Sequence, residues 1–383
     1  MSIEELAALS RHYGSDPEYV IAGGGNTSFK NESTLWVKGS GVFMGEIKPG
    51  DFVRMDRRKL ADIWKKKYPE DPAEREAAVL AGMLAARESG EENKRPSVET
   101  LLHDLLPFPW VVHLHPALVN GLTCSAGGRE AAERLFGPVI WIDSENPGYV
   151  LSLKVKGALE HSAASVSSAG NFPPGSLVFL QNHGVFAAAD SPDGIRALYG
   201  KIMDTIRAEA GEGPDFSDAV CEYASSASAS KIFAGCAGRE GEEYHAVFAR
   251  NRAIAGLVAD RAAFFPVSSA FTPDHIVYAG SDPLFVEEPP PGKDPGEHIR
   301  EAWKDHLATF GRAPKIAALS KTGVFGIGVS QKAARLALEL FTDTVKVAAW
   351  TKKFGGPRFM EEDKIAFINN WEAERYRSQR SGS

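Results

Sequence analysis

Three histidines in this chain are spaced as ligands of a single metal ion would be. His113 and His115 lie two positions apart in a short apolar run bounded by prolines, 110–115, which predicts a buried strand. Because strand side chains alternate between two faces, both imidazoles project from the same face. His183 follows a second predicted strand, 177–180, and precedes a glycine. Three neutral imidazoles that leave one position open are typical of catalytic zinc, and other divalent metals also fit, although two such histidines alone are more often structural.

A carboxylate, Glu99, is the candidate proton carrier. Ser97 is predicted to cap a helix over 98–106, which places Glu99 in the first turn, where the helix dipole stabilises a negative charge. The same turn offers backbone N–H groups and the Ser97 hydroxyl to an anion such as phosphate. Glu99 could therefore act as an acid/base beside a bound phosphate, or could only complement the dipole. His103, one turn later, could orient Glu99, but a half-buried histidine is the commoner case and we leave it outside the site.

Two glycine-rich segments could hold the rest of a substrate. In GGGNTS, residues 23–28, glycines allow a close approach of the backbone, and Asn26 and Ser28 supply side-chain hydrogen bonds. In KGSG, residues 38–41, Ser40 and Gly41 add a hydroxyl and N–H groups beside a lysine. Phosphate or carboxylate is the expected ligand, although two tight turns and a solvated lysine would explain the same residues. Neither segment matches the glycine motifs of dinucleotide or P-loop nucleotide sites.

The elements that must position these residues alternate irregularly between helix and strand. This pattern favours an α/β layer fold with a mixed sheet, in which the two glycine segments flank one hairpin. Proline, serine and aspartate at helix starts and prolines at helix ends set the predicted boundaries. The predicted helices are 3–13, 72–87, 98–106 and 191–210, and the predicted strands are 19–22, 34–38, 110–115, 139–142, 149–155 and 177–180.

Composition narrows the class of protein. The chain has 383 residues, a length that favours two globular units over the alternative of one large α/β domain, and 43% of them are hydrophobic, as in ordinary globular proteins. Its net charge of -7 disfavours nucleic acid as a partner. The three cysteines lack CxxC spacing, which argues against a disulfide framework or a zinc ribbon and favours a reducing compartment. The amino terminus has two glutamates and no apolar signal region, and no stretch is apolar enough to span a membrane, so we expect a cytoplasmic protein without a membrane partner.

An internal similarity accompanies a composition shift near 210–218, where we place a domain boundary between 1–212 and 213–383. At a constant separation of 139 residues, short matches recur on both sides of this boundary. The later unit is either a degenerate partial copy of a strand-turn-helix unit or a second unit that shares only a turn. In both cases Thr322 occupies the position of His183, so we expect no second metal site. The expected roles of the later unit are packing, subunit contacts or covering of the active-site mouth. The matches are Gly184-Val185-Phe186, Ser191, Arg196 and Asp204-Thr205 with Gly323-Val324-Phe325, Ser330, Arg335 and Asp343-Thr344.

The order of these motifs resembles the class II aldolase/adducin-head family, which includes fuculose-phosphate and rhamnulose-phosphate aldolases. The resemblance covers about residues 5 to 210. It implies a class II aldolase-like layered fold, with a central mixed, mainly antiparallel sheet and flanking helices, followed by a second, smaller α/β domain. The rest of the chain looks more loosely like the aldolase half of bifunctional aldolase/short-chain dehydrogenase proteins, without the dehydrogenase half. The motifs are GGGN with Ser28, KGSG, Pro96-Ser97-Val98-Glu99-Thr100, His113-Leu114-His115-Pro116 and Asn182-His183-Gly184-Val185.

Carried over residue by residue, the resemblance assigns roles at the site. It implies that His113, His115 and His183 bind zinc and that Glu99 is the catalytic acid/base. The substrate phosphate would be bound by Asn26, Ser40, Gly41 and Ser97, with Ser28 as a further candidate from the glycine segment. One departure is Val98, where small aldolases of the family place a second serine, so a side-chain contact to phosphate is lost. We assign no residue to the family's carboxyl-terminal tyrosine, which protonates the aldehyde.

The resulting hypothesis is a metal-dependent aldolase that cleaves a ketose phosphate to dihydroxyacetone phosphate and an aldehyde through a metal-stabilised enediolate. An epimerase, decarboxylase or dehydratase acting on a sugar phosphate or hydroxy acid would need the same histidines and is the alternative within the family. A non-catalytic interaction protein, like the adducin heads, is the alternative from another class. The expected partners are a small sugar phosphate or hydroxy-carbonyl compound and further copies of the chain in a homo-oligomer.

Overall fold

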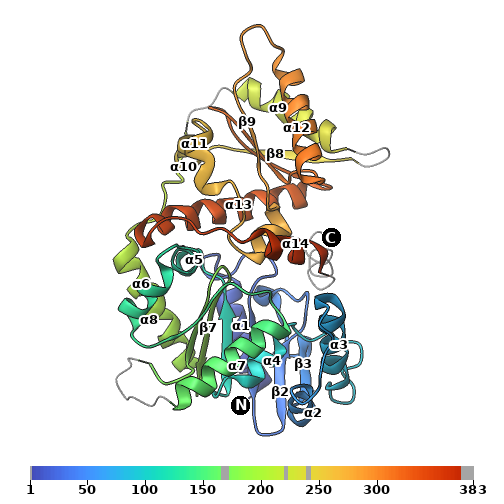
Figure 1. Ribbon diagram of the computed structural model, residues 1–383, viewed down its shortest axis with the longest axis vertical. Coiled ribbons are helices and arrows are strands. Elements are labelled where there is room, and N and C mark those ends of the chain that lie inside the picture. Colours follow the sequence, from blue (N-terminus) through green and yellow to red (C-terminus); the bar gives the residue numbers. More distant parts are fainter. Residues whose placement is uncertain (1, 165–171, 220–222, 239–242, 372–383) are drawn as a thin grey trace.

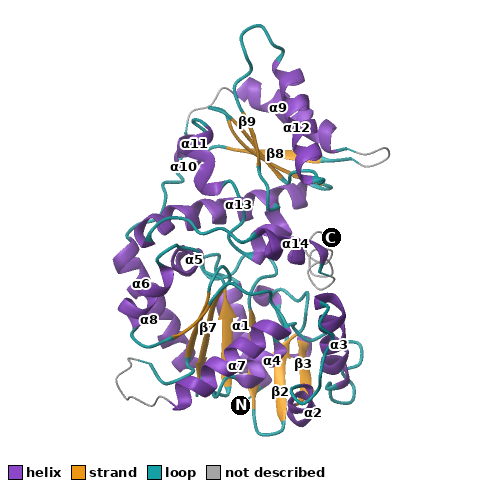
Figure 2. Ribbon diagram, viewed as in Figure 1, coloured by secondary structure: helices purple, strands orange, loops and turns teal. Residues whose placement is uncertain are grey.

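The computed structural model describes residues 2–164, 172–219, 223–238 and 243–371, which form two sheets flanked by helices (Figures 1 and 2). Among the strand pairs described, only β5 with β6 and β9 with β10 are parallel, so the predicted mixed, mainly antiparallel sheet is confirmed. The seven-stranded sheet has the order β3 (Phe52–Asp56), β2 (Thr34–Lys38), β1 (Asn26–Lys30), β4 (Trp110–Leu114), β7 (Gly184–Ala189), β6 (Leu177–Leu180) and β5 (Ile140–Ile142). The four-stranded sheet has the order β8 (His245–Ala249), β11 (Gly323–Gly328), β10 (Ile316–Leu319) and β9 (Leu284–Val286).

Helices cover both faces of the seven-stranded sheet. The face that carries Val112 and Leu114 packs against α1 (Ile3–Gly14) and α8 (Pro192–Ala210). The face that carries Val111 packs against α4 (Thr100–Leu105) and α7 (Tyr149–Ala164). The other elements of this part are η1 (Met44–Glu46), η2 (Pro49–Asp51), α2 (Arg57–Ile63), α3 (Pro72–Ala85), α5 (Ala117–Thr123) and α6 (Gly128–Phe136).

The predicted start of the hairpin is wrong. The chain at 19–22 forms turns instead of a strand, and β1 begins only at Asn26, inside the segment that we expected to be loop. Ala22 and Gly25 both adopt positive φ, at 54° and 68°, and the Gly24 N–H closes a turn onto the Ile21 carbonyl. An extended strand cannot contain such backbone angles, so the apolar composition of this segment reflects its packing and not a strand.

Two further predictions need correction, one of an element type and one of a helix start. Residues 149–155, predicted as a strand, begin α7: Leu151 and Val155 are buried one helical turn apart, whereas Leu153 between them is 43% exposed. The alternation of Ser152 and Lys154 with apolar residues in this segment mimicked the strand period, but the burial of its side chains follows the helix period. Helix α4 starts two residues later than predicted, so Glu99 occupies the position just before the helix.

A second group of helices surrounds the four-stranded sheet. Helix α13 (Gln331–Thr351) lies between the two sheets in Figure 1 and packs against α5 of the first half, residues 1–212. The contact depends on Gly121, because a Cβ there would lie 2.5 Å from the Trp350 Cβ. The other elements of the second half, residues 213–383, are α9 (Tyr223–Ala237), α10 (Arg252–Leu257), α11 (Arg261–Phe264), η3 (Phe265–Val267), the π-helix η4 (His275–Ala279), α12 (Pro295–Phe310), η5 (Lys352–Phe354) and α14 (Glu362–Asn370).

The internal similarity extends beyond a shared turn. Strands β4-β7-β6-β5 and β8-β11-β10-β9 have the same order and the same relative directions. The turns between the central strands both contain a left-handed residue, Asn182 at φ 58° and Lys321 at φ 57°. Ser191 and Ser330 cap α8 and α13 with φ of -149° in both cases. We call these four strands with their following helix the repeated frame; the strands β1–β3 extend only the first sheet.

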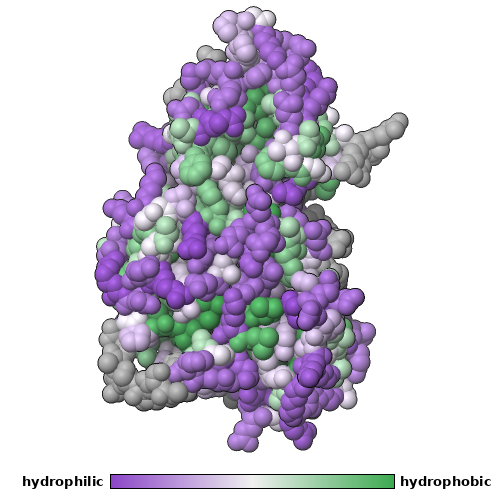
Figure 3. Space-filling view, in the orientation of Figure 1, coloured by the Kyte–Doolittle hydropathy of each residue, from purple (hydrophilic) through white to green (hydrophobic). Residues whose placement is uncertain are grey.

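The surface in Figure 3 is mostly hydrophilic over both halves, and hydrophobic side chains gather in separate smaller areas. Among the described residues, no helix combines the length and apolar character that crossing a membrane requires.

Candidate metal centre and anion pocket

The three predicted ligands converge at one end of the seven-stranded sheet. His113 lies in β4 and His115 directly after it, while His183 follows the left-handed residue Asn182 in the turn between β6 and β7. Their ligand nitrogens all lie within 4.8 Å of one another, and the Nε2 atoms of His113 and His115 are 2.8 Å apart. The sheet therefore brings together residues that are separated by about 70 positions in the chain.

Hydrogen bonds on the far side of each ring determine which nitrogen faces the cluster. His113 Nδ1 donates to the Val185 carbonyl at 3.1 Å, and the Tyr199 hydroxyl donates to the same carbonyl at 3.2 Å. His115 Nδ1 donates to Asp274 Oδ2 at 2.6 Å. Because both acceptors lack protons, the two Nδ1 atoms must carry them, and both Nε2 lone pairs point into the same space. Two lone pairs 2.8 Å apart repel each other unless a cation lies between them.

The third imidazole is also in the state that binds metals. Burial, reinforced by the neighbouring His115 and His113, lowers the pKa of His183 to about 3, although the charge of Glu99 opposes this shift. His183 is therefore neutral near pH 7, as a metal ligand must be.

Glu99 supplies a negative charge at the same point. Its Oε1 lies 3.4 Å from His113 Nε2 and 3.7 Å from His183 Nε2. This oxygen is buried and accepts no hydrogen bond from the described residues. A buried carboxylate oxygen among neutral imidazoles is costly unless a cation compensates it. The three histidines and Glu99 therefore fit a divalent metal ion.

A hydrogen-bonded chain holds Glu99 in place. Asn26 Nδ2 donates to Glu99 Oε2 at 2.6 Å, and the Asn26 amide oxygen bonds His103 Nε2. His103 Nδ1 in turn lies 2.7 Å from Ser28 Oγ, and burial holds the pKa of His103 well below its usual value. His103, which we left outside the site, thus orients Glu99 through Asn26. Ser28 was expected to bind substrate, but its side chain is fully buried behind Asn26 and bonded to His103.

A pocket next to the histidines brings the predicted anion-binding residues together. Asn26, Ser40, Gly41 and Ser97 all line it. A hydrogen bond from the Ser40 N–H to the Arg95 carbonyl, at 2.8 Å, joins the KGSG segment, residues 38–41, to the segment that leads to Ser97. The other lining residues are Gly23, Gly25, Lys38, Val98, Glu99, Pro147, His183 and Pro273.

Sequence reasoning did not identify two residues of the second half that reach this site. Pro273 lines the anion pocket and Asp274 bonds His115. Asp274 is separated from His115 by 159 positions, so no local spacing could connect them. Both residues belong to the segment Thr272-Pro273-Asp274-His275, in the part of the chain whose family resemblance is looser.

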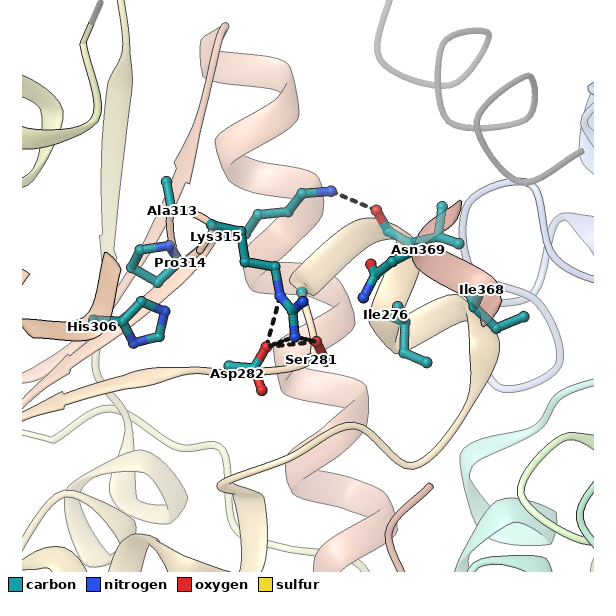
Figure 4. Close-up of a pocket in the computed structure, with 12 residues that line it drawn as sticks. Ile276, Ser281, Asp282, His306, Ala313, Pro314, Lys315, Ile368 and Asn369 are labelled. Carbon is teal, nitrogen blue, oxygen red and sulfur yellow. Dashed lines mark hydrogen bonds and ion pairs between the residues drawn. The ribbon is translucent and has the colours of Figure 1, made fainter. Parts of the chain in front are cut away.

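Another pocket lies in the second half, between η4, the start of β10 and α14 (Figure 4). The charged groups that line it bond their own neighbours: Arg312 pairs with Asp282 and bonds Ser281, and Lys315 Nζ donates to the Val277 carbonyl at 2.5 Å. It contains no cluster of metal-ligating side chains among the described residues. The histidine cluster is therefore the candidate site.

A family comparison matches the part of the chain that contains the three histidines. The family described as "Class II Aldolase and Adducin N-terminal domain" matches residues 4–199. A curated relative, "Uncharacterized oxidoreductase YuxG" of Bacillus subtilis (strain 168), is 29% identical over 216 residues, 54% of this chain. The match spans only 28% of that relative's length.

Solved structures cover a similar part of the chain. The N-terminal class II aldolase domain of a conserved Thermoplasma acidophilum protein is 24% identical, with a TM-score of 0.45, over 54% of this chain and 93% of that chain. YgbL of Escherichia coli, described as "a putative aldolase/epimerase/decarboxylase", is 16% identical, with a TM-score of 0.37, over 54% and 86%. L-fuculose-1-phosphate aldolase of Thermus thermophilus is 17% identical, with a TM-score of 0.34, over 54% and 92%.

Proposed function

Because this chain belongs to the family of class II aldolase and adducin N-terminal domains, we propose that it is a metal-dependent aldolase that cleaves a ketose phosphate to dihydroxyacetone phosphate and an aldehyde. The observation that carries the proposal is the buried Glu99 Oε1, which lacks a hydrogen-bond donor among the described residues and faces the Nε2 atoms of His113 and His183. A non-catalytic interaction protein would have no use for such a costly arrangement.

We propose that His113, His115 and His183 hold a zinc ion. Three neutral imidazole nitrogens within 4.8 Å of one another match the ligand set of catalytic zinc sites. When bound, the ion supplies a Lewis acid that stabilises negative charge on the substrate oxygens as the carbon–carbon bond breaks.

Glu99 is the proposed acid/base. Its Oε1 faces the histidine cluster, and it would accept and return the proton at the donor carbon of the substrate. Its Oε2 is held by the Asn26 amide, so the carboxylate presents one defined oxygen to the substrate. His103 keeps the Asn26 amide in the orientation that donates to Glu99.

The anion pocket is the proposed site of the substrate phosphate. Asn26, Ser40 and Ser97 supply polar side chains, and the Gly41 backbone allows a close approach. Lys38 is buried in the pocket wall, where its Nζ donates to the Val42 carbonyl at 2.7 Å, and it adds positive charge.

Val98 favours a second candidate within the same family. Its apolar side chain lines the anion pocket where small aldolases of the family carry a serine, which weakens the case for a phosphate. A carboxylate needs fewer donors than a phosphate, so a reaction on a hydroxy acid, such as decarboxylation, epimerisation or dehydration, is the second candidate.

We also propose that the chain divides near residue 212 into a catalytic domain, 1–212, and a second domain, 213–383, without a metal site. The cytoplasmic location and the homo-oligomer stay predictions from composition and family resemblance.

A substrate screen tests the proposed function. The zinc-loaded full chain is incubated with a panel of ketose 1-phosphates, and release of dihydroxyacetone phosphate is measured. We expect release with at least one substrate, its loss on chelation and its recovery when zinc is returned, with His183→Ala as the inactive control. Silence across the panel with turnover of a hydroxy acid would favour the second candidate, and a wild-type protein that binds no divalent metal would overturn both.

A further inference from the structure

We propose that Asp274, supplied by the second half of the chain, is a positioning residue that holds His115 as a ligand and thereby sets the metal affinity of the site. This inference rests on the proposed metal dependence. It gives the second half a role that the sequence alone does not indicate.

The contact between Asp274 and His115 is close and shielded from water. Asp274 Oδ2 lies 2.6 Å from His115 Nδ1, and both side chains are at most about a tenth exposed. Gly24 makes room for this contact, because a Cβ at that position would lie 2.8 Å from Asp274 Oδ2. A carboxylate behind a ligating imidazole fixes the ring orientation and makes the metal-facing nitrogen more basic.

Asp274 places a negative charge behind the imidazole ring of His115. His113 has the neutral Val185 carbonyl in the equivalent place, at the longer distance of 3.1 Å. A carboxylate polarises the imidazole more strongly than a carbonyl does. The charge of Asp274 also adds to that of Glu99 and so favours a divalent cation at the centre.

The segment that carries Asp274 is anchored on both sides. Before it, Asn182 Nδ2, from the residue next to the ligand His183, donates to the Phe271 carbonyl at 3.0 Å. After it, His275 Nε2 lies 3.0 Å from Asp343 Oδ2 of α13. Further along η4, Lys315 Nζ holds the Val277 carbonyl (Figure 4). These contacts preorganise Asp274, so the metal site does not have to order this segment when it binds an ion.

Zinc affinity of the metal-free full chain tests the inference, measured by competition with a chromophoric chelator. We expect Asp274→Ala to bind zinc about 10- to 100-fold more weakly than wild type. Asp274→Asn keeps an acceptor for His115 but loses the charge, so we expect a smaller but measurable loss, of roughly 3- to 10-fold. Asp343→Asn is the matched control: it removes the charge from the neighbouring buried histidine–carboxylate pair, away from the ligands, but leaves an amide oxygen that still accepts from His275 and so keeps the segment anchored. We expect it to stay within about twofold of wild type.

Thermal unfolding of the metal-free proteins separates a folding defect from a binding defect. If Asp274→Ala does not fold, Asp274→Asn decides the question. Wild-type affinity in the folded Asp274 variants would overturn the role of Asp274 and leave the proposed function intact. An equal loss in Asp343→Asn would also overturn it, because the segment as a whole would then be responsible. A wild-type protein that binds no zinc would overturn this inference together with the proposed metal dependence.

Discussion

The two copies of the repeated frame hold different residues at the same positions. His113 pairs with Phe186 across the sheet, and Phe248 pairs with Phe325, which lies 139 residues after Phe186. By this register Phe248 and Arg250 stand where the first copy has His113 and His115, and Thr322 stands at the position of His183. The turn, the helix cap and the strand order are the same in both copies. The frame therefore does not require histidines at these positions.

The second copy has an arginine, Arg250, at the position of His115. Arg250 Nη1 donates to the carbonyls of Lys321 and Thr322 at 2.6 and 2.5 Å, and so ties the end of β8 to the turn before β11. In the first copy the same strand end and the same turn carry His115 and His183. In the second copy the Arg250 guanidinium thus links the strand end to the turn. In the first copy the same two places carry two of the proposed metal ligands.

Exchanging one residue between the copies is expected to have the largest effect. His183→Thr installs the residue of the second copy and removes one of three ligands. We expect bound metal to fall below stoichiometric amounts and aldol cleavage to fall by more than about 1,000-fold, because the ion supplies several kcal/mol of transition-state stabilisation. Elemental analysis and the dihydroxyacetone phosphate assay measure the two effects.

The reverse exchange, Thr322→His, is the control. It adds a histidine to a frame that still carries Phe248 and Arg250, so we expect no second equivalent of metal. Uptake of a second ion would show that the two copies differ less than their residues indicate, and full activity in His183→Thr would contradict the ligand assignment.

The next effect concerns Glu99. Glu99→Gln keeps the size of the side chain and its contact with Asn26 but cannot carry a proton as a carboxylate does. We expect kcat to fall by about 100- to 1,000-fold while zinc is retained. Steady-state kinetics with parallel metal analysis would measure this. A variant that keeps its activity would exclude Glu99 as the acid/base, and a variant that loses its metal would make Glu99 a ligand instead.

A smaller effect is expected at Tyr199, whose counterpart in the second copy is Leu338. The Tyr199 hydroxyl donates to the buried carbonyls of Val112 and Val185, at 3.0 and 3.2 Å. Tyr199→Phe should lower the free energy of unfolding by about 1–2 kcal/mol, because the buried hydrogen bonding of its hydroxyl is lost. Urea unfolding of the metal-free protein measures this change. Leu338→Ala in the second copy removes apolar contacts and no hydrogen bond. It is therefore the comparison for the loss of the Tyr199 hydroxyl in the first copy.

The smallest effect is expected at Arg250. Arg250→Met removes two hydrogen bonds of the second copy at a partly exposed position, so we expect a loss of about 1 kcal/mol in unfolding free energy. Zinc affinity should stay within about twofold of wild type. A large loss of zinc binding would mean that the second copy contributes more to the site than Asp274.

Local sequence signals predicted much of the fold and most of the residues that gather at the candidate site. The alternation of strand side chains correctly placed His113 and His115 together, and the glycine after His183 marked a real turn. The strand predicted at 149–155 was wrong because polar residues alternate with apolar residues on a helix whose buried positions are four apart. Asp274 could not be predicted, because its contact with His115 depends on how two distant parts of the chain pack.

The separation of 159 residues between His115 and Asp274 has a consequence for the order of events during synthesis. The ribosome releases all three histidines and Glu99 well before Asp274, and each part of the chain folds as it emerges. A nascent first half then carries the ligands without the carboxylate that stabilises His115. Tight retention of the ion is expected only after the segment that carries Asp274 has docked against the first half, so metal retention would report that docking.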